Sequence, residues 1–288
     1  IGKLVPTAFA IFVVILAQSA ATSRAYAARY NERFSENTDL VGLALANIGA
    51  GLSGTFVVNG SPTKTQMVDS AGGRTQLSLL VTVAIVLLAA LLFAYVFVTR
   101  QMRVTGLVAQ ADPRTLPDYA PLFLLMALIL LGPVASVEPV TLAMLAGVSI
   151  SVGFAEELMF RGLLFHWFRD QSVRRQILIS AFAFGGAHLL GLLVMDAVAV
   201  IVAQSIFAAG VGAVFACARA RDRSIWLPVM VHAAFDFVAL AAAGGIGSAL
   251  EDSPATVIRL LVGAVIVWLW AAWLIWRAPR YELSEATA

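Results

Sequence analysis

Three charged residues stand in an otherwise apolar stretch of this sequence: Glu156, Glu157 and Arg161. At the centre of a membrane-spanning helix each such charge costs roughly 2.5–3.5 kcal/mol. Charged side chains persist there when they pair with one another, face a cavity or take part in a reaction. This stretch is therefore the first candidate for a functional site.

The two glutamates of this stretch are expected to have different roles. Glu157 and Arg161 are four residues apart and share a helix face, which predicts an internal salt bridge. Glu156 is offset by about 100° around the helix and has no partner at local spacing. A carboxylate in that position is suited to act as a general base directed into a cavity.

Two histidines in other apolar runs could meet the free carboxylate. His188 follows Phe184-Gly-Gly-Ala, and His232 stands four residues before Asp236. A single histidine within a membrane is more often a packing or hydrogen-bonding residue, but two near a paired-glutamate helix favour a shared site. The third histidine, His166, would lie about 15 Å farther along the helix, so we expect it at the membrane interface.

The composition identifies the environment of these residues. The 288 residues are 60% apolar and 12% charged, with a mean hydropathy of +0.89. These values predict an all-α polytopic transmembrane helical bundle with about nine spanning helices and one broken element near 58–73. The apolar runs place the helices at residues 5–22, 40–57, 76–98, 119–137, 140–168, 175–193, 196–217, 226–245 and 254–277.

Charge and cysteine content exclude some function classes. A net charge of +2, with basic residues spread over short loops, does not indicate a nucleic-acid partner. Cys217 is the only cysteine, so the chain has no intrachain disulfide. Lys3, the apolar run 4–16 and the small residues after it imitate a secretory signal, but we expect a spanning helix there.

Arginines between the apolar runs predict the orientation. They follow the third, fifth, seventh and ninth helices, and the positive-inside rule places these loops in the cytoplasm. The residues are Arg100, Arg103, Arg114, Arg169, Arg174, Arg175, Arg219, Arg221, Arg223, Arg277 and Arg280. We therefore expect a multi-pass protein of a bacterial-type inner (cytoplasmic) membrane, with the active site opening toward the cytoplasmic side.

The broken element suggests a separate anion site. Turn-forming residues from Asn59 to Pro62 precede Thr63 and Lys64, where a short helix is expected to begin. Ser61, Thr63, Lys64 and the free N–H groups of that helix could hold an anion within the membrane. The alternative interpretation is an outer loop with an amphipathic turn.

The first ninety or so residues resemble SulP-type anion transporters. The resemblance rests on Val5-Pro-Thr-Ala-Phe, Ser19-Ala-Ala-Thr-Ser-Arg24-Ala-Tyr, Gly42-Leu-Ala-Leu-Ala-Asn47, Gly60-Ser-Pro-Thr-Lys64 and Ala71-Gly-Gly-Arg74-Thr-Gln76. It implies that Ser61, Thr63 and Lys64 correspond to the substrate-facing start of a half-helix. SulP transport needs an inverted partner repeat, and nothing in residues 100–288 repeats the Gly-Ser-Pro-Thr pattern. A working transporter is therefore not expected from this chain alone.

The second part of the chain resembles the CPBP or Abi family of intramembrane proteases, which includes the type II CAAX prenyl proteases. The resemblance rests on the order and spacing of three motifs: Glu156-Glu157-x-x-x-Arg161, Phe184-x-x-x-His188 and His232-x-x-x-Asp236. The predicted domains are therefore a SulP-like fragment at 1–95 and a protease domain at 96–288, with its motif core at about 120–245.

This second resemblance implies roles for the motif residues. Glu156 would activate a water with help from His188, while His232 and Asp236 would hold the scissile carbonyl or its oxyanion. Glu157 and Arg161 would support these groups, and Phe160 and Phe184 would contact the substrate. An ionised Asp236 cannot donate a hydrogen bond, so it is protonated, orients His232 or ligates a cation.

Zinc is the alternative to a metal-free glutamate mechanism. Glu156, His188, His232 and Asp236 together could form a zinc site with one position left for water. We slightly favour the metal-free form.

The expected activity is hydrolysis of a peptide bond in a membrane-embedded or membrane-adjacent peptide or protein, with the lipid bilayer as the other partner. Nothing in the sequence indicates a pocket for a prenyl group. The alternatives are a membrane anion-binding or transport-related element, and a non-catalytic membrane protein with a structural polar cluster.

Overall fold

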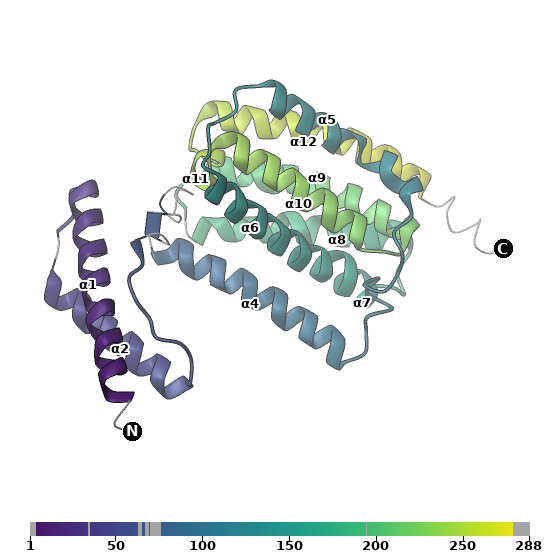
Figure 1. Ribbon diagram of the computed structural model, residues 1–288. Coiled ribbons are helices and arrows are strands. Elements are labelled where there is room, and N and C mark those ends of the chain that lie inside the picture. Colours follow the sequence, from purple (N-terminus) through teal and green to yellow (C-terminus); the bar gives the residue numbers. More distant parts are fainter. Residues whose placement is uncertain are drawn as a thin grey trace. The chain divides into compact units, whose positions relative to one another are not determined.

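A computed structural model describes residues 4–33, 35–62, 65–66, 69, 76–193 and 195–278 of the chain (Figure 1). The described residues form helices and contain no strand. They divide into two compact units, residues 1–70 and 71–288, which are described separately. The domain boundary that the sequence places at 95/96 remains a prediction, because compactness and family resemblance need not change at the same residue.

The first unit contains two long helices, α1 (Leu4–Tyr30) and α2 (Glu36–Ser53). After α2 the chain runs back along α1, where Asn59 Nδ2 donates to Gln18 Oε1 at 2.8 Å. The Gly60 N–H donates to Ser19 Oγ at 2.7 Å, and a Cβ on Gly60 would come within 2.8 Å of the Ser19 backbone. This contact places Ser61 beside α1, whereas Thr63 and Lys64 lie outside the described residues.

The second unit is a helical bundle built around α9 (Val198–Asp222). Its other long helices are α4 (Gln76–Val98), α5 (Ala120–Leu131), α6 (Pro139–Glu157), α8 (Val173–His188), α10 (Trp226–Ala243) and α12 (Pro254–Arg277). Short helical segments connect them: η1 (Pro113–Tyr119), η2 (Leu158–Leu164), α7 (Phe165–Trp167), η3 (Leu189–Leu193) and α11 (Ile246–Ala249). Figure 1 shows α4 at the edge of this bundle, beside α6.

The predicted polytopic all-α bundle is confirmed, with a difference in the number of spans. Seven helices among the described residues are long and apolar enough to cross a membrane, where about nine were expected. Helix α2 is not one of these seven. Glu36 and Asp39 in its first turn make it more polar than the others. Helix α4 runs from Gln76 to Val98, and its segment Leu87–Val98 is apolar. The chain is a multi-pass integral membrane protein.

The helix expected at 140–168 is not one regular helix. After α6 the chain widens into a π-helix, η2, before α7. The reason lies in neighbouring helices, which bind carbonyls of the widened segment: Ser180 Oγ donates to the Phe160 carbonyl at 3.1 Å. Arg219 Nε donates to the Arg161 carbonyl, also at 3.1 Å. Such π segments are rare and often occur at functional sites.

The arginine-rich loops of the second unit meet at one end of the bundle. Arg221 Nη1 pairs with both carboxylate oxygens of Asp118 at 2.6 Å. Asp222 accepts the N–H of Asp112 at 2.6 Å, and Trp226 Nε1 donates to the Leu107 carbonyl at 2.8 Å. These contacts tie the loops after α4 and α9 together, and the cytoplasmic location expected from the arginines remains a prediction.

Helices α8 and α9 pack closely where α8 carries a glycine. A Cβ on Gly185 would come within 2.6 Å of the Ala209 Cβ and 2.7 Å of the Ser205 carbonyl. Ser205 Oγ also donates to the Gly185 carbonyl at 2.7 Å. The neighbouring Gly186 has open space where a Cβ would be. Close helix packing therefore explains Gly185.

We expect Gly185→Ala to destabilise the protein by about 1–3 kcal/mol, because the added methyl group has no room between the helices. Gly186→Ala is the matched control and should be neutral or stabilising by up to about 1 kcal/mol, since alanine favours the helix. Thermal unfolding of both variants in detergent measures the difference. Equal stabilities would contradict the packing described here.

Candidate active site

A fully buried ion pair forms the base of the site. Arg161 Nη1 donates to Glu157 Oε1 at 2.9 Å, and neither side chain has any exposed surface. This is the salt bridge that the four-residue spacing predicted. A buried pair is stable only if its geometry is good and the remaining polar atoms are satisfied.

Aromatic rings enclose the guanidinium of Arg161. Its Cζ lies 4.3 Å from the ring centroid of Phe184, 5.3 Å from that of Phe215 and 5.9 Å from that of Phe160. A Cβ on Gly212 would come within 3.0 Å of Arg161 Nη2. Cation–π contacts are strongest when desolvated, so these rings compensate part of the cost of burying the charge.

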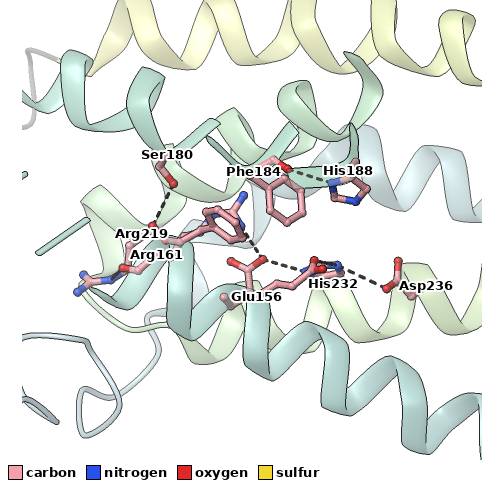
Figure 2. Close-up of polar contacts among 10 residues, drawn as sticks. Glu156, Arg161, Ser180, Phe184, His188, Arg219, His232 and Asp236 are labelled. Carbon is pink, nitrogen blue, oxygen red and sulfur yellow. Dashed lines mark hydrogen bonds and ion pairs between the residues drawn. The ribbon is translucent and has the colours of Figure 1, made fainter. Parts of the chain in front are cut away.

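His232 joins this ion pair to two further carboxylates (Figure 2). Its Nδ1 lies 2.8 Å from Glu157 Oε1. Because the same Glu157 oxygen accepts from Arg161, Nδ1 carries a proton and donates it. Its Nε2 lies 3.6 Å from Glu156 Oε2 and 3.5 Å from Asp236 Oδ2. One imidazole therefore links three carboxylates, two of which face the same ring nitrogen.

Glu156 and Asp236 form the open side of the cluster. Their side chains are 32% and 31% exposed, whereas Glu157 is fully buried and His232 is 8% exposed. The Oε2 atom of Glu156 is enclosed and has no hydrogen-bond partner among the described residues. A carboxylate with one enclosed oxygen and a partly exposed side chain is suited to accept a proton from a molecule entering on that side.

His188 faces this open side from α8. Its Nδ1 lies 2.9 Å from the Phe184 carbonyl, so Nδ1 carries a proton and a neutral ring leaves Nε2 as an acceptor. The Phe184 ring packs edge-on against both histidines, with centroids 5.0 Å from His188 and 5.8 Å from His232. Figure 2 shows His188 across from the row formed by Glu156, His232 and Asp236. The three motifs therefore meet at one place.

Residues 138–238 match the family model of the Rce1-like type II CAAX prenyl endopeptidases. The match contains all three motifs, and it confirms the resemblance seen in the sequence. At the level of the family, it supports a CAAX-type intramembrane protease.

Residues 1–129 match the family model of the sulfate permeases. A probable sulfate transporter of Mycobacterium tuberculosis is 35% identical over 85 residues, which are 30% of this chain and 15% of that protein. Pendrin of Homo sapiens is 28% identical over 90 residues, 31% of this chain and 12% of pendrin. No solved structure matches the chain. The SulP resemblance is thereby confirmed, for a small part of each relative's length.

The sulfate permease match extends beyond residue 90, where the resemblance was expected to end. Yet residues 113–129 pack against the Rce1-like segment. Asp118 pairs with Arg221, and Trp270 Nε1 donates to the Asp118 carbonyl at 2.8 Å. The Tyr119 ring packs on Phe215 at a centroid distance of 5.7 Å. These residues therefore support the fold around the Rce1-like site.

The two phenylalanines expected to contact substrate lie under the site. Phe184 is 2% exposed, and its ring supports both histidines and Arg161. Phe160 is partly exposed and packs edge-on against Phe184 at a centroid distance of 5.3 Å. Their contact with a substrate remains a prediction, and for Phe184 it would require exposure of a buried ring.

Sequence reasoning missed several residues that support the Rce1-like site: Ser180, Gly212, Phe215 and Arg219. The only signals were a serine, a glycine, a phenylalanine and an arginine within apolar helices. Nothing in the spacing showed that Ser180 and Arg219 would bind main-chain carbonyls of another helix, because that contact depends on how the helices pack.

Zinc binding by the four candidate ligands remains a prediction. Among residues with described positions, no three His, Cys, Asp or Glu side chains are placed to hold a metal ion. The mechanism below follows the metal-free form.

Proposed function

We propose that the chain is an intramembrane endopeptidase in which Glu156 activates a water molecule. The supporting observation is the division between the two adjacent glutamates. Glu157 is buried between Arg161 and His232, whereas Glu156 is partly exposed and faces His232 and Asp236. One carboxylate holds the site together, and the other is free to accept a proton.

The proposed reaction begins when Glu156 accepts a proton from water. The water oxygen attacks the scissile carbonyl carbon, and negative charge develops on the carbonyl oxygen. His232 acts here as an imidazolium: its Nδ1–H is held by Glu157, and its Nε2–H donates where that charge develops. The C–N bond then breaks, and the proton from Glu156 passes to the leaving amine. His188 orients the water, and Asp236 orients His232.

The proposed substrate is a peptide segment within or next to the membrane. The site lies among spanning helices, and the arginine-rich loops gather at one end of the second unit. Following the positive-inside rule, we propose that this end lies in the cytoplasm, that the membrane is a bacterial-type inner membrane, and that the site opens toward the cytoplasm. Comparing prenylated and unmodified peptides in the cleavage assay determines whether the substrate carries a prenyl group.

The test is peptide cleavage by the full chain purified in detergent, with a library of membrane-derived peptides read by mass spectrometry. We expect His188→Ala to lower kcat/KM by about 100-fold or more, because water is no longer oriented. His166→Ala is the matched control, since this histidine contacts Arg169 outside the cluster. No cleavage by well-folded wild type, or equal cleavage by both variants, would contradict the proposal.

Chelation should leave the activity unchanged. With no metal in the proposed mechanism, incubation with a zinc chelator is expected to change kcat/KM by less than about twofold. The measurement combines the cleavage assay with a metal determination on the purified protein. Stoichiometric zinc whose removal abolishes cleavage would overturn the metal-free mechanism.

The first segment supports a second candidate function, anion binding. The observation favouring it is the sulfate permease match, together with the contacts that place Ser61 beside α1. Sulfate should then raise the thermal stability of wild type and of Glu156→Gln, but not of Lys64→Ala. Sulfate stabilisation that persists in Lys64→Ala, or that is absent from wild type, would contradict it.

A further inference from the structure

The π-helix η2 lies between the glutamates and the rest of the fifth span. It begins at Leu158, directly after Glu157, and it contains Arg161, the ion-pair partner of that glutamate. A π-helix is rare compared with an α-helix, so external contacts must favour it here. Its geometry also sets where the two glutamates stand, since they occupy the turn that leads into it.

Arg219 of α9 supplies one of those contacts. Its side chain is largely buried, and Nε donates to the Arg161 carbonyl at 3.1 Å. Nη2 donates to the Val104 carbonyl at 3.3 Å, on the segment that follows α4. A single guanidinium therefore joins the π-helix to a second stretch of main chain. Hydrogen bonds from a charged donor are stronger than neutral ones.

The surrounding backbone leaves room for this guanidinium. Gly106 has a φ of +83°, and a Cβ there would come within 3.1 Å of Arg219 Nη2. The same Cβ would lie 2.5 Å from the Arg223 carbonyl. A side chain at residue 106 would therefore displace both the guanidinium and the α9–α10 loop. The position of Arg219 thus depends on the fold of two separate loops.

A continuous series of contacts leads from Arg219 to the reacting groups. Arg219 holds the main chain of Arg161, whose side chain holds Glu157. Glu157 in turn binds Nδ1 of His232, whose Nε2 faces Glu156. Ser180 binds the adjacent carbonyl of the π-helix, but it makes a single neutral hydrogen bond.

We propose that Arg219 is a positioning residue, which fixes the π-helix and thereby the distance between Glu156 and His232. The inference rests on the proposed protease function. Arg219 does not touch the reacting atoms, so its loss should affect the alignment of the site. A misplacement of about 1 Å can lower a rate about 100-fold.

The experiment compares Arg219→Gln and Arg219→Lys in the full chain in detergent. Arg219→Gln should lower kcat by about 10- to 100-fold with little change in KM, because the substrate still binds to a misaligned site. It should also speed amide hydrogen exchange in residues 158–165. Arg219→Lys retains the charge and one donor, so it should restore part of both effects.

The matched control is Arg221→Gln, on the same helix. It removes an equal charge and breaks the ion pair with Asp118 of η1, while the hydrogen bond from Arg219 to the π-helix remains. It should lower the melting temperature but leave kcat and the exchange of residues 158–165 unchanged. If Arg219→Gln fails to fold, Ser180→Ala provides the second variant and should speed the same exchange with a smaller loss of kcat.

Unchanged exchange and kcat in Arg219→Gln, or equal effects in Arg221→Gln, would overturn the inference. If wild type cleaves nothing, the protease proposal fails, and the exchange of residues 158–165 alone then decides whether Arg219 fixes the π-helix. Faster exchange in Arg219→Gln but not in Arg221→Gln would support that role. The two failures are therefore distinguishable.

Discussion

Glu156→Gln is expected to lower kcat/KM for peptide cleavage by about 10³-fold while the protein remains folded. Glutamine has nearly the same shape as glutamate but cannot accept the proton of the attacking water, and general bases typically contribute about 10²–10⁴-fold. The fold should tolerate the change because Glu156 is partly exposed and its Oε2 atom makes no hydrogen bond among the described residues.

The matched control for this variant is Glu138→Gln. Glu138 is exposed, stands at the start of α6 and makes no capping hydrogen bond with its side chain. Glu138→Gln should leave kcat/KM for cleavage and the free energy of unfolding at their wild-type values. Cleavage by Glu156→Gln at the wild-type rate would contradict its role as a base and favour a structural polar cluster.

Arg161→Met is expected to destabilise the protein by about 3–5 kcal/mol, because it leaves the fully buried Glu157 without its cationic partner. Removing one member of a buried pair costs far more than the pair itself contributes. The double variant Arg161→Met with Glu157→Gln should therefore lose less stability than Arg161→Met alone. Denaturant unfolding of the full chain in detergent gives the comparison.

An exposed pair provides the control for the effect of burial. Arg169 and Asp170 are 3.9 Å apart with side chains 62% and 85% exposed. Arg169→Gln removes the same charge and should change stability by less than about 1 kcal/mol, since exposed pairs contribute little. A loss below about 1 kcal/mol in Arg161→Met would contradict the buried pair described here.

These two expectations assign opposite results to neighbouring residues. Glu156→Gln should lower kcat/KM strongly and leave stability nearly unchanged. Arg161→Met, which removes the partner of Glu157, should lower the stability of the fold itself. In the sequence, Glu156 and Glu157 differ only in the helix face on which they lie. Their burial separates them much more clearly, because one side chain is about a third exposed and the other is fully enclosed.

Much of the fold could be predicted from the sequence because membrane helices must bond their backbone internally and present apolar side chains to lipid. Length and hydropathy therefore located the helices α9, α10 and α12 closely. The same rules could not predict the π-helix at Leu158–Leu164, since it depends on donors from other helices. They predicted about nine spans, and seven helices among the described residues are long and apolar enough to cross a membrane.

The membrane environment, the Glu157–Arg161 pair and the three motifs could be predicted from the residues alone, because they depend on composition and on spacing along one helix. The packing of the helices was needed to show that His232 contacts both glutamates, that Phe215 and Gly212 enclose the guanidinium, and that Arg219 holds the π-helix. Those contacts join residues 50 or more positions apart, as in the 75 between Glu157 and His232 and the 58 between Arg161 and Arg219. Local periodicity carries no information about such distances, which are set when the helices pack.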